Sequence, residues 1–180
     1  MTARPQILIT DRRKRDRREY EPTIPPSMYS CESEQWILGA LMIDPEALPK
    51  VCVIIGAGHF YLDAHRRIYT HIERLIIQGT HPDPVTLCDS LTRANELEQA
   101  GGFDYIADLT NIPSAANVVA HARIVRERAM MRELLAYGER VVALAGGALP
   151  VAEALKAAQE GWNAVKASYT SHLKSSSSKS

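Results

Sequence analysis

The chain has 180 residues, 46% of them hydrophobic, and its 21 acidic residues balance 21 basic ones. This length accommodates one domain with a core, or a small domain with an extension. Because the charges balance, net charge gives no reason to expect a nucleic-acid or membrane partner. No run of eighteen apolar residues and no secretory signal occurs, so we expect a cytoplasmic protein that crosses no membrane, with Cys31, Cys52 and Cys88 as reduced thiols.

Residues 1–27 are predicted to form a disordered tail, because they lack the apolar residues needed to offset the entropy of ordering. The tail contains a basic cluster, which is diluted by acidic residues and followed by prolines. Such an arm can contact nucleic-acid phosphates, or it can be a solvated tail; the interleaved acids favour the second interpretation. The cluster consists of Arg12, Arg13, Lys14, Arg15, Arg17 and Arg18.

Residues 28–112 are predicted to form a small globule of several helices separated by turns. Ser30 is a helix cap, followed by acidic residues in the first turn. Asp44-Pro45 and Asp83-Pro84 each combine a cap with a proline at the first helical position. A further helix is expected from about Asp63 to Gln78, ended by Gly79. No segment alternates with period two over the length of a strand, so the predicted fold class is all-α.

Residues 113–169 are predicted to form a long antiparallel helical hairpin, which begins at Pro113-Ser114 and turns at Gly146-Gly147. Residues 170–180 are predicted to be a disordered Ser/Lys tail. Apolar residues in the hairpin recur with steps of three and four, as in helices that pack lengthwise on each other. The predicted seam between the two helices comprises Leu134, Tyr137, Val141, Leu144, Leu155, Trp162 and Val165.

A second apolar row, Met131, Leu135 and Val142, lies beside this seam. Two helices cannot cover both rows, and extra apolar surface on exposed helices is typical of an interaction site. We therefore predict that this row contacts a partner's hairpin. The alternative is that it packs on the protein's own globule.

Motifs of catalysis are missing from the sequence. Gly56-Ala57-Gly58 lacks the remainder of a phosphate-binding loop and is interpreted as a turn. His59, Asp63, His65 and His71 are close in sequence, but His65 and His71 are spaced so that they lie on opposite faces of one helix. We therefore predict no catalytic residue, no cofactor and no metal.

Several strings of the sequence resemble the N-terminal domain of the bacterial replicative DNA helicase family, DnaB. They occur in the family's order between about residues 26 and 168, and IVRER is the most specific of them. The usual polar-proline turn before Phe60 is replaced by Gly56–His59. The strings are ESEQWILGALMID (32–44), FY (60–61), HRRIY (65–69), PVTL (84–87), GG (101–102), PSAAN (113–117) and IVRER (124–128).

The resemblance implies a helical globule followed by a hairpin, in which hairpins pair between subunits to build a collar that docks primase or a helicase loader. The family's ATPase motor has no counterpart in these 180 residues, so the implied role is a non-catalytic interaction and oligomerisation module. Several alternatives stay open. The chain is a fragment of a full helicase, or a stand-alone regulator that binds or poisons a helicase ring. From a different class, it is a nucleic-acid-binding adaptor that uses the basic arm, or an enzyme with an unrecognised site.

Overall fold

The computed structural model describes residues 25–112 and 114–177, with backbone alone from residue 171 onward. Every regular element in these ranges is a helix, which confirms the all-α class. The 3-10 helices are η1 (Pro26–Met28), η2 (Pro45–Ala47) and η3 (Ala57–His59). The α-helices are α1 (Cys31–Ile43), α2 (Leu48–Cys52), α3 (Asp63–Ile77), α4 (Pro84–Arg93), α5 (Gly102–Asp108), α6 (Val118–Gly146) and α7 (Val151–Ser177).

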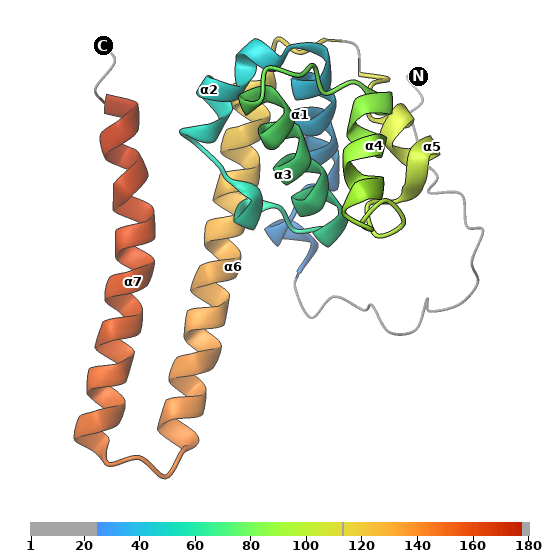
Figure 1. Cartoon of the computed structure of the whole chain (residues 1–180). Coiled ribbons are helices and arrows are strands. Elements are labelled where there is room, and N and C mark those ends of the chain that lie inside the picture. The colour runs from blue at the N-terminus through green and yellow to red at the C-terminus, as the bar shows by residue number, and fades with distance from the viewer. Residues whose placement is uncertain (1–24, 113, 178–180) are drawn as a thin grey trace, which may run out of the picture.

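Helix α1 is the central element of the globule (Figure 1). As predicted, Ser30 caps it, because the Ser30 hydroxyl accepts the N–H of Ser33 at 3.3 Å. The helix is buried on nearly all sides and packs against both α3 and α6. Gly39 allows a very close approach to the end of α5, since a Cβ there would lie 2.0 Å from the carbonyl oxygen of Leu109.

Helix α4 begins as the sequence predicts. The Asp83 carboxylate accepts the N–H groups of Val85 at 2.8 Å and Thr86 at 2.9 Å, and Pro84 occupies the first turn. These contacts satisfy two of the amides that a helix start leaves without partners. The chain then turns through Gly101 and Gly102, both with positive φ, into α5.

The hydrophobic core lies between α1, α3, α4 and the first half of α6. Its α6 contribution comes from Val118, Ala122 and Val125. Ala129 is the last buried residue of the described chain, so beyond it α6 leaves the globule. The largest fully buried side chains include Ile37, Leu38, Leu41, Ile55, Phe60, Ile68, Tyr69, Ile72, Leu87, Leu91 and Ile106.

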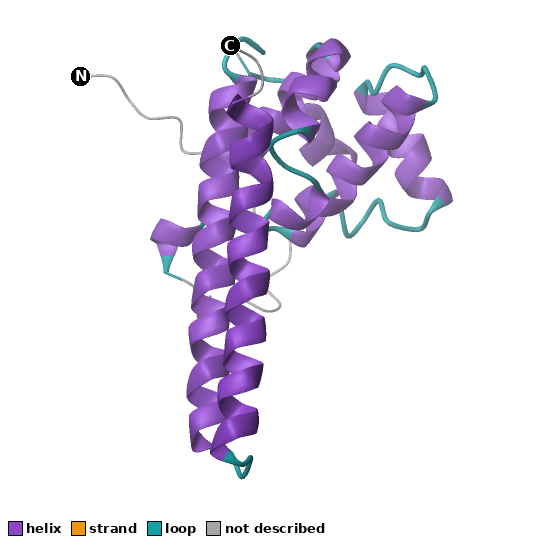
Figure 2. Ribbon diagram, turned by 90° about the vertical axis from the view of Figure 1, so that its left-hand side faces the viewer, coloured by secondary structure: helices purple, strands orange, loops and turns teal. Residues whose placement is uncertain are grey.

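Helices α6 and α7 form an antiparallel hairpin that extends far beyond the globule (Figures 1 and 2). Its 29-residue α6 is about 43 Å long at 1.5 Å per residue. Gly146 and Gly147 end α6 as predicted, and the carbonyl of Pro150 accepts the first N–H bonds of α7. None of the described helices is long and apolar enough to cross a membrane.

Both outer ends of the hairpin differ from the prediction. Helix α6 begins at Val118 rather than near Ser114, because the Ser114 hydroxyl accepts the N–H of Ala116 at 3.0 Å and forms a separate turn. Helix α7 continues to Ser177, past Tyr169, since no glycine or proline follows Gly161 to stop it. Pro113 and the basic residues from Arg12 to Arg18 lie outside the described residues.

Candidate protein-interaction surface

Small side chains form the face of α7 that packs on α6. Ala157, Ala158 and Gly161 share a hollow with Tyr137 and Val141 of α6. The Tyr137 ring lies so close that a Cβ on Gly161 would be 3.1 Å from it. The Tyr137 hydroxyl also donates to the carbonyl oxygen of Ala158 at 3.1 Å. At this point of the seam the Tyr137 ring of α6 packs on the small residues of α7, and its hydroxyl is hydrogen-bonded to the α7 backbone.

The residues predicted for the seam divide into two groups. Tyr137, Val141, Leu144 and Val165 are half-buried, and the first three line the hollow between the helices. Three others are more exposed: Leu134 by 44%, Trp162 by 43% and Leu155 by 67%. Leu155 lies outside the seam, because Ala157, Ala158 and Gly161 occupy the side of α7 that faces Tyr137. Trp162 keeps one ring contact with Tyr137, at a centroid distance of 5.9 Å.

The second apolar row lies along an open groove on α6. Met131, Leu135 and Val142 line it together with Leu134 and Gly138, and Met28 of η1 also lines it. The groove encloses about 610 Å³. Val142 is 73% exposed and Met131 42% exposed, so the chain itself covers this row only partly. Gly138 has no atom within 4 Å of the place its Cβ would take, which leaves the groove floor open.

The exposed apolar residues of α6 and α7 lie on the same side of the hairpin. One residue advances about 100° around a helix, so Gly138 follows Tyr137 by that angle on α6, and Trp162 follows Gly161 by the same angle on α7. The helices are antiparallel with Tyr137 facing Gly161, so both rotations point to the same side. The hairpin face, as we call it, consists of Met131, Leu134, Leu135, Gly138 and Val142 of α6 and Val151, Leu155, Trp162 and Tyr169 of α7.

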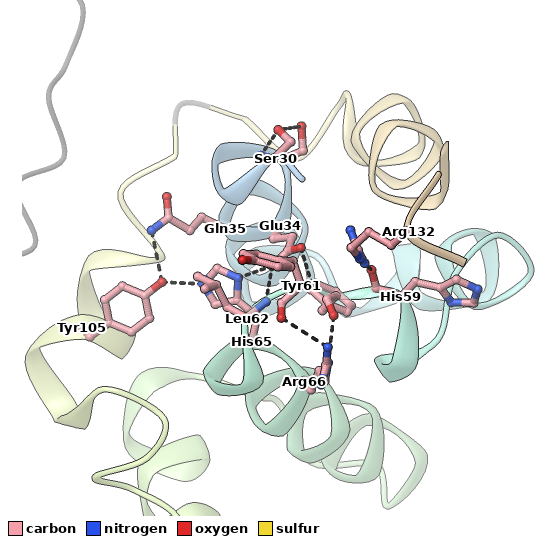
Figure 3. A network of polar contacts seen from close by, with 12 residues as sticks. Ser30, Glu34, Gln35, His59, Tyr61, Leu62, His65, Arg66, Tyr105 and Arg132 are labelled. Atoms are coloured by element: carbon pink, nitrogen blue, oxygen red, sulfur yellow. Dashed lines mark hydrogen bonds and ion pairs between the residues drawn. The ribbon is translucent and has the colours of Figure 1, made fainter. Parts of the chain in front are cut away.

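A buried polar network holds the loop between η3 and α3 on which the hairpin rests (Figure 3). The Glu34 carboxylate, 1% exposed, accepts the N–H of Tyr61 at 2.6 Å and of Leu62 at 3.4 Å. It also accepts from Nδ1 of His65 at 2.6 Å. Nε2 of His65 is then free to accept the hydroxyl proton of Tyr105, at 2.5 Å. Burial raises the pKa of Tyr105, which keeps this hydroxyl a donor.

Two arginines of α6 fasten the hairpin to the same loop. Arg132 donates to the carbonyl oxygens of Met28 at 2.8 Å and His59 at 2.6 Å, and its guanidinium lies 5.5 Å from the centre of the Tyr61 ring. Arg126 donates to Nε2 of His59 at 2.6 Å and to the carbonyl oxygen of Ser168 at 2.7 Å. Burial lowers the pKa of both guanidinium groups. Sequence reasoning missed these roles, since the partners lie 42 to 104 positions away.

The histidines considered as metal ligands have other partners. His65 belongs to the Glu34 network, and His71 contacts Ser90 at 2.8 Å and Glu96 at 3.2 Å. Asp63 pairs with Arg67 at 2.8 Å. In the described ranges, no group of three or more His, Cys, Asp or Glu side chains is arranged to hold a metal ion.

Comparison with known proteins places the chain among replication proteins. The family described as DnaB-like helicase N-terminal domain matches residues 26–127. The replicative DNA helicase DnaB of Haemophilus influenzae is 35% identical over 142 residues, which are 78% of this chain and 29% of the relative. That of Pasteurella multocida is 40% identical over 119 residues, 66% and 25% of the two chains. The chain thus spans between a quarter and a third of the length of these relatives.

Two solved structures resemble the fold. The N-terminal domain of DnaB helicase from Mycobacterium tuberculosis has a TM-score of 0.71 and 33% identity, over 74% of this chain and 95% of that chain. A DnaB-like replicative helicase, described with its interactions with primase, has a TM-score of 0.61 and covers 77% of this chain and 31% of its own. Its identity of 23% supports the fold alone.

Proposed function

The chain belongs to the DnaB-like helicase N-terminal domain family, and on this basis we propose that it is a non-catalytic interaction and oligomerisation module of DNA replication. The observation that carries the proposal is the hairpin face. It extends along two long helices on one side, and seven of its residues are between 42% and 76% exposed: Met131, Leu134, Val142, Val151, Leu155, Trp162 and Tyr169. An apolar face of this length on an exposed element is typical of a protein–protein contact.

A second copy of the chain is the occupant that we propose for this face. Two hairpins that bury equivalent faces form a four-helix bundle, a stable way to cover two-helix surfaces. Such a contact is isologous, so each residue of the face is used twice. Gly138 suits this arrangement, because a glycine on the groove floor lets a neighbouring helix approach closely.

Primase, a helicase loader or a replicative helicase is the further partner that we propose. A structurally similar DnaB-like replicative helicase is described as interacting with primase. We extend the interaction with primase to this chain because the chain belongs to the same family. Docking of such a partner requires a second surface, on the globule or on the assembled hairpins.

Substitution of Leu135 by Glu tests self-association. The new carboxylate stays hydrated in the monomer but loses water in the assembly, which costs several kcal/mol, on the order of 2–5, in association. We expect Leu135→Glu to give a helical protein of monomeric mass by light scattering and circular dichroism. Val85→Glu is the control, since Val85 is 69% exposed on the globule and away from the face.

The wild type and Val85→Glu should both be multimers. A wild-type chain that is monomeric at high concentration, or a Leu135→Glu chain that keeps the wild-type mass, contradicts self-association through this face. Light scattering with and without added primase or helicase then tests the second partner separately.

A further inference from the structure

The groove on α6 lies where the N-terminal part of the chain enters the described structure. Met28 of η1 lines the groove, and Arg132 of α6 fixes this residue by donating to its carbonyl oxygen at 2.8 Å. The N–H of Met28 donates in turn to the carbonyl of Pro25 at 2.9 Å, so the start of η1 is held close to the same place. Residues 1–24, which lie outside the described ranges, are therefore attached to the globule beside the groove.

The sequence of residues 1–24 contains one run of consecutive apolar side chains, Ile7, Leu8 and Ile9, which we call the apolar triplet. Aliphatic side chains of this kind are among those most often buried in proteins. Three residues of extended chain span about 10 Å, and the groove between Met131 and Val142 extends about 16 Å along α6. The apolar triplet therefore fits within the length of the groove.

The connection between the apolar triplet and the groove has a favourable length. Residues 10–24 link Ile9 to Pro25. For the disordered tail that the sequence predicts, a connection of about 15 residues has a root-mean-square end-to-end distance of about 20 Å. A tether raises the local concentration of a binding segment most when this distance is close to the span that it must cover. The span here is set by the length of the groove, so the tether and the groove match.

We propose that the apolar triplet of the same chain occupies the α6 groove. Docking removes apolar surface of both the triplet and the groove from water, which a fully solvated tail would leave exposed. The basic cluster then follows near Glu139, the one charged side chain among the described residues that line the groove. Opposite charges on the two sides add a weak surface attraction.

The docked triplet would compete with a second copy of the chain, a consequence that rests on the proposed function. The triplet covers only the α6 half of the hairpin face, whereas Val151 and Leu155 of α7 stay open. In an isologous contact each copy has to release its own triplet before the two faces meet. The N-terminal segment would therefore raise the concentration at which the chains assemble.

The rate of methionine oxidation measures whether the groove is covered. Met131 lies in the groove, and dilute hydrogen peroxide converts an accessible methionine to its sulfoxide, which mass spectrometry locates. All chains carry Leu155→Glu, which is on α7 outside the groove, and are measured where light scattering gives a monomeric mass. Leu8→Asp places a charge in the apolar triplet. With a local concentration of about 1 mM, a groove covered for about half to four-fifths of the time predicts about two- to fivefold faster oxidation of Met131 in Leu8→Asp.

Two controls separate docking from other effects. Thr2→Asp adds the same charge to the same segment outside the triplet, and it should leave the Met131 rate unchanged. Met130 lies about 100° before Met131 around α6 and does not line the groove, so its rate reports opening of the helix. Equal Met131 rates with and without Leu8→Asp overturn the docking. An equal rise in Thr2→Asp, or at Met130, overturns it as well.

Self-association is scored separately, on chains that keep Leu155. Because both copies must empty their grooves, Leu8→Asp should tighten the dimer about 4- to 25-fold, the square of the effect on one groove, as light scattering over a dilution series measures. Chains that stay monomeric at all concentrations, with faster Met131 oxidation in Leu8→Asp, contradict the proposed self-association and support the docking. Unchanged oxidation in a chain that does self-associate overturns the docking alone.

Discussion

At the scale of single residues, the structure depends on a few buried polar side chains whose bonds are all made inside the protein. Glu34 is the main example, because its carboxylate joins α1 to the loop before α3 and to His65. No buried side-chain nitrogen or oxygen in the described residues is without a partner. The pattern of apolar residues does not predict such a network, since Glu34 resembles an ordinary first-turn acid and its partners are distant in sequence.

Removing the Glu34 carboxylate should therefore be costly. Glu34→Ala leaves the buried N–H of Tyr61, the partly buried N–H of Leu62 and the ring of His65 without this acceptor, which we expect to lower the free energy of unfolding by about 3–5 kcal/mol. Chemical denaturation measures this change. Glu32→Ala is the control, because Glu32 is exposed in the same helical turn, and it should change stability by less than about 1 kcal/mol. Equal effects of the two substitutions would show that the network contributes little.

Glycine substitutions separate close packing from helix propensity. Gly39→Ala places a methyl group 2.0 Å from the Leu109 carbonyl oxygen, so α1 and α5 must move apart, at a cost of about 1–3 kcal/mol. Gly138→Ala adds a methyl group in open space within an exposed helix and should stabilise the folded monomer by up to about 1 kcal/mol. Thermal unfolding at low protein concentration should shift in opposite directions for the two. A shared direction would contradict the close approach at Gly39.

At the scale of elements, the sequence predicts helix boundaries wherever a side chain or a glycine has a single local role. Ser30, Asp83 and the Gly146-Gly147 pair lie where predicted because capping and stopping depend only on near neighbours. The start of α6 was misplaced, since Ser114 can serve a turn as well as a helix. The prediction for Leu155 differs from the structure because a spacing of three and four residues fits two adjacent faces of α7 equally well. The position of Tyr137 against Gly161 shows which of these faces packs on α6.

The cap of α4 gives a prediction about pH. Hydrogen bonds from the N–H groups of Thr86 and Val85 hold the pKa of Asp83 below its ordinary value. A lowered folded-state pKa stabilises the fold above the unfolded pKa of about 4, and this contribution is lost as pH falls below it. At pH 7, Asp83→Ala should cost about 1 kcal/mol.

Asp83→Asn is the matched variant, since its amide oxygen can cap without a charge. Its stability relative to wild type should improve as pH is lowered from 7 to 3, as measured by urea unfolding at each pH. A constant difference between the two proteins over this range would mean that the charge of Asp83 does not contribute to the cap.

At the scale of the whole molecule, the chain consists of two parts that differ in what stabilises them. The globule has a core of fully buried side chains, and α6 contributes to it only as far as Ala129. Past that residue, side chains in the described hairpin are half-buried or exposed. Helices with so little burial gain most of their stability from packing partners, so the outer hairpin should open at a lower free energy than the globule.

Deleting residues 148–180 tests this division. The deletion removes α7 and Trp162, which leaves Trp36 as the one tryptophan of the chain. Trp36 reports on the globule, because its indole N–H donates to the Ser114 carbonyl at 3.1 Å and its ring stacks on His121 at 4.8 Å. We expect the thermal midpoint of Trp36 fluorescence to move by less than about 4–8 °C, equivalent to about 1 kcal/mol.

The same deletion should remove self-association and part of the helicity of α6. The globule keeps its core, whereas the second half of α6 loses α7, the long helix that packs along it. Light scattering and circular dichroism on the deleted chain measure these two changes, at a concentration where the full chain is a multimer. If the globule also unfolds in the deleted chain, the globule and the hairpin form one cooperative unit. In that case α7 stabilises the core, through contacts such as that of Arg126 with Ser168.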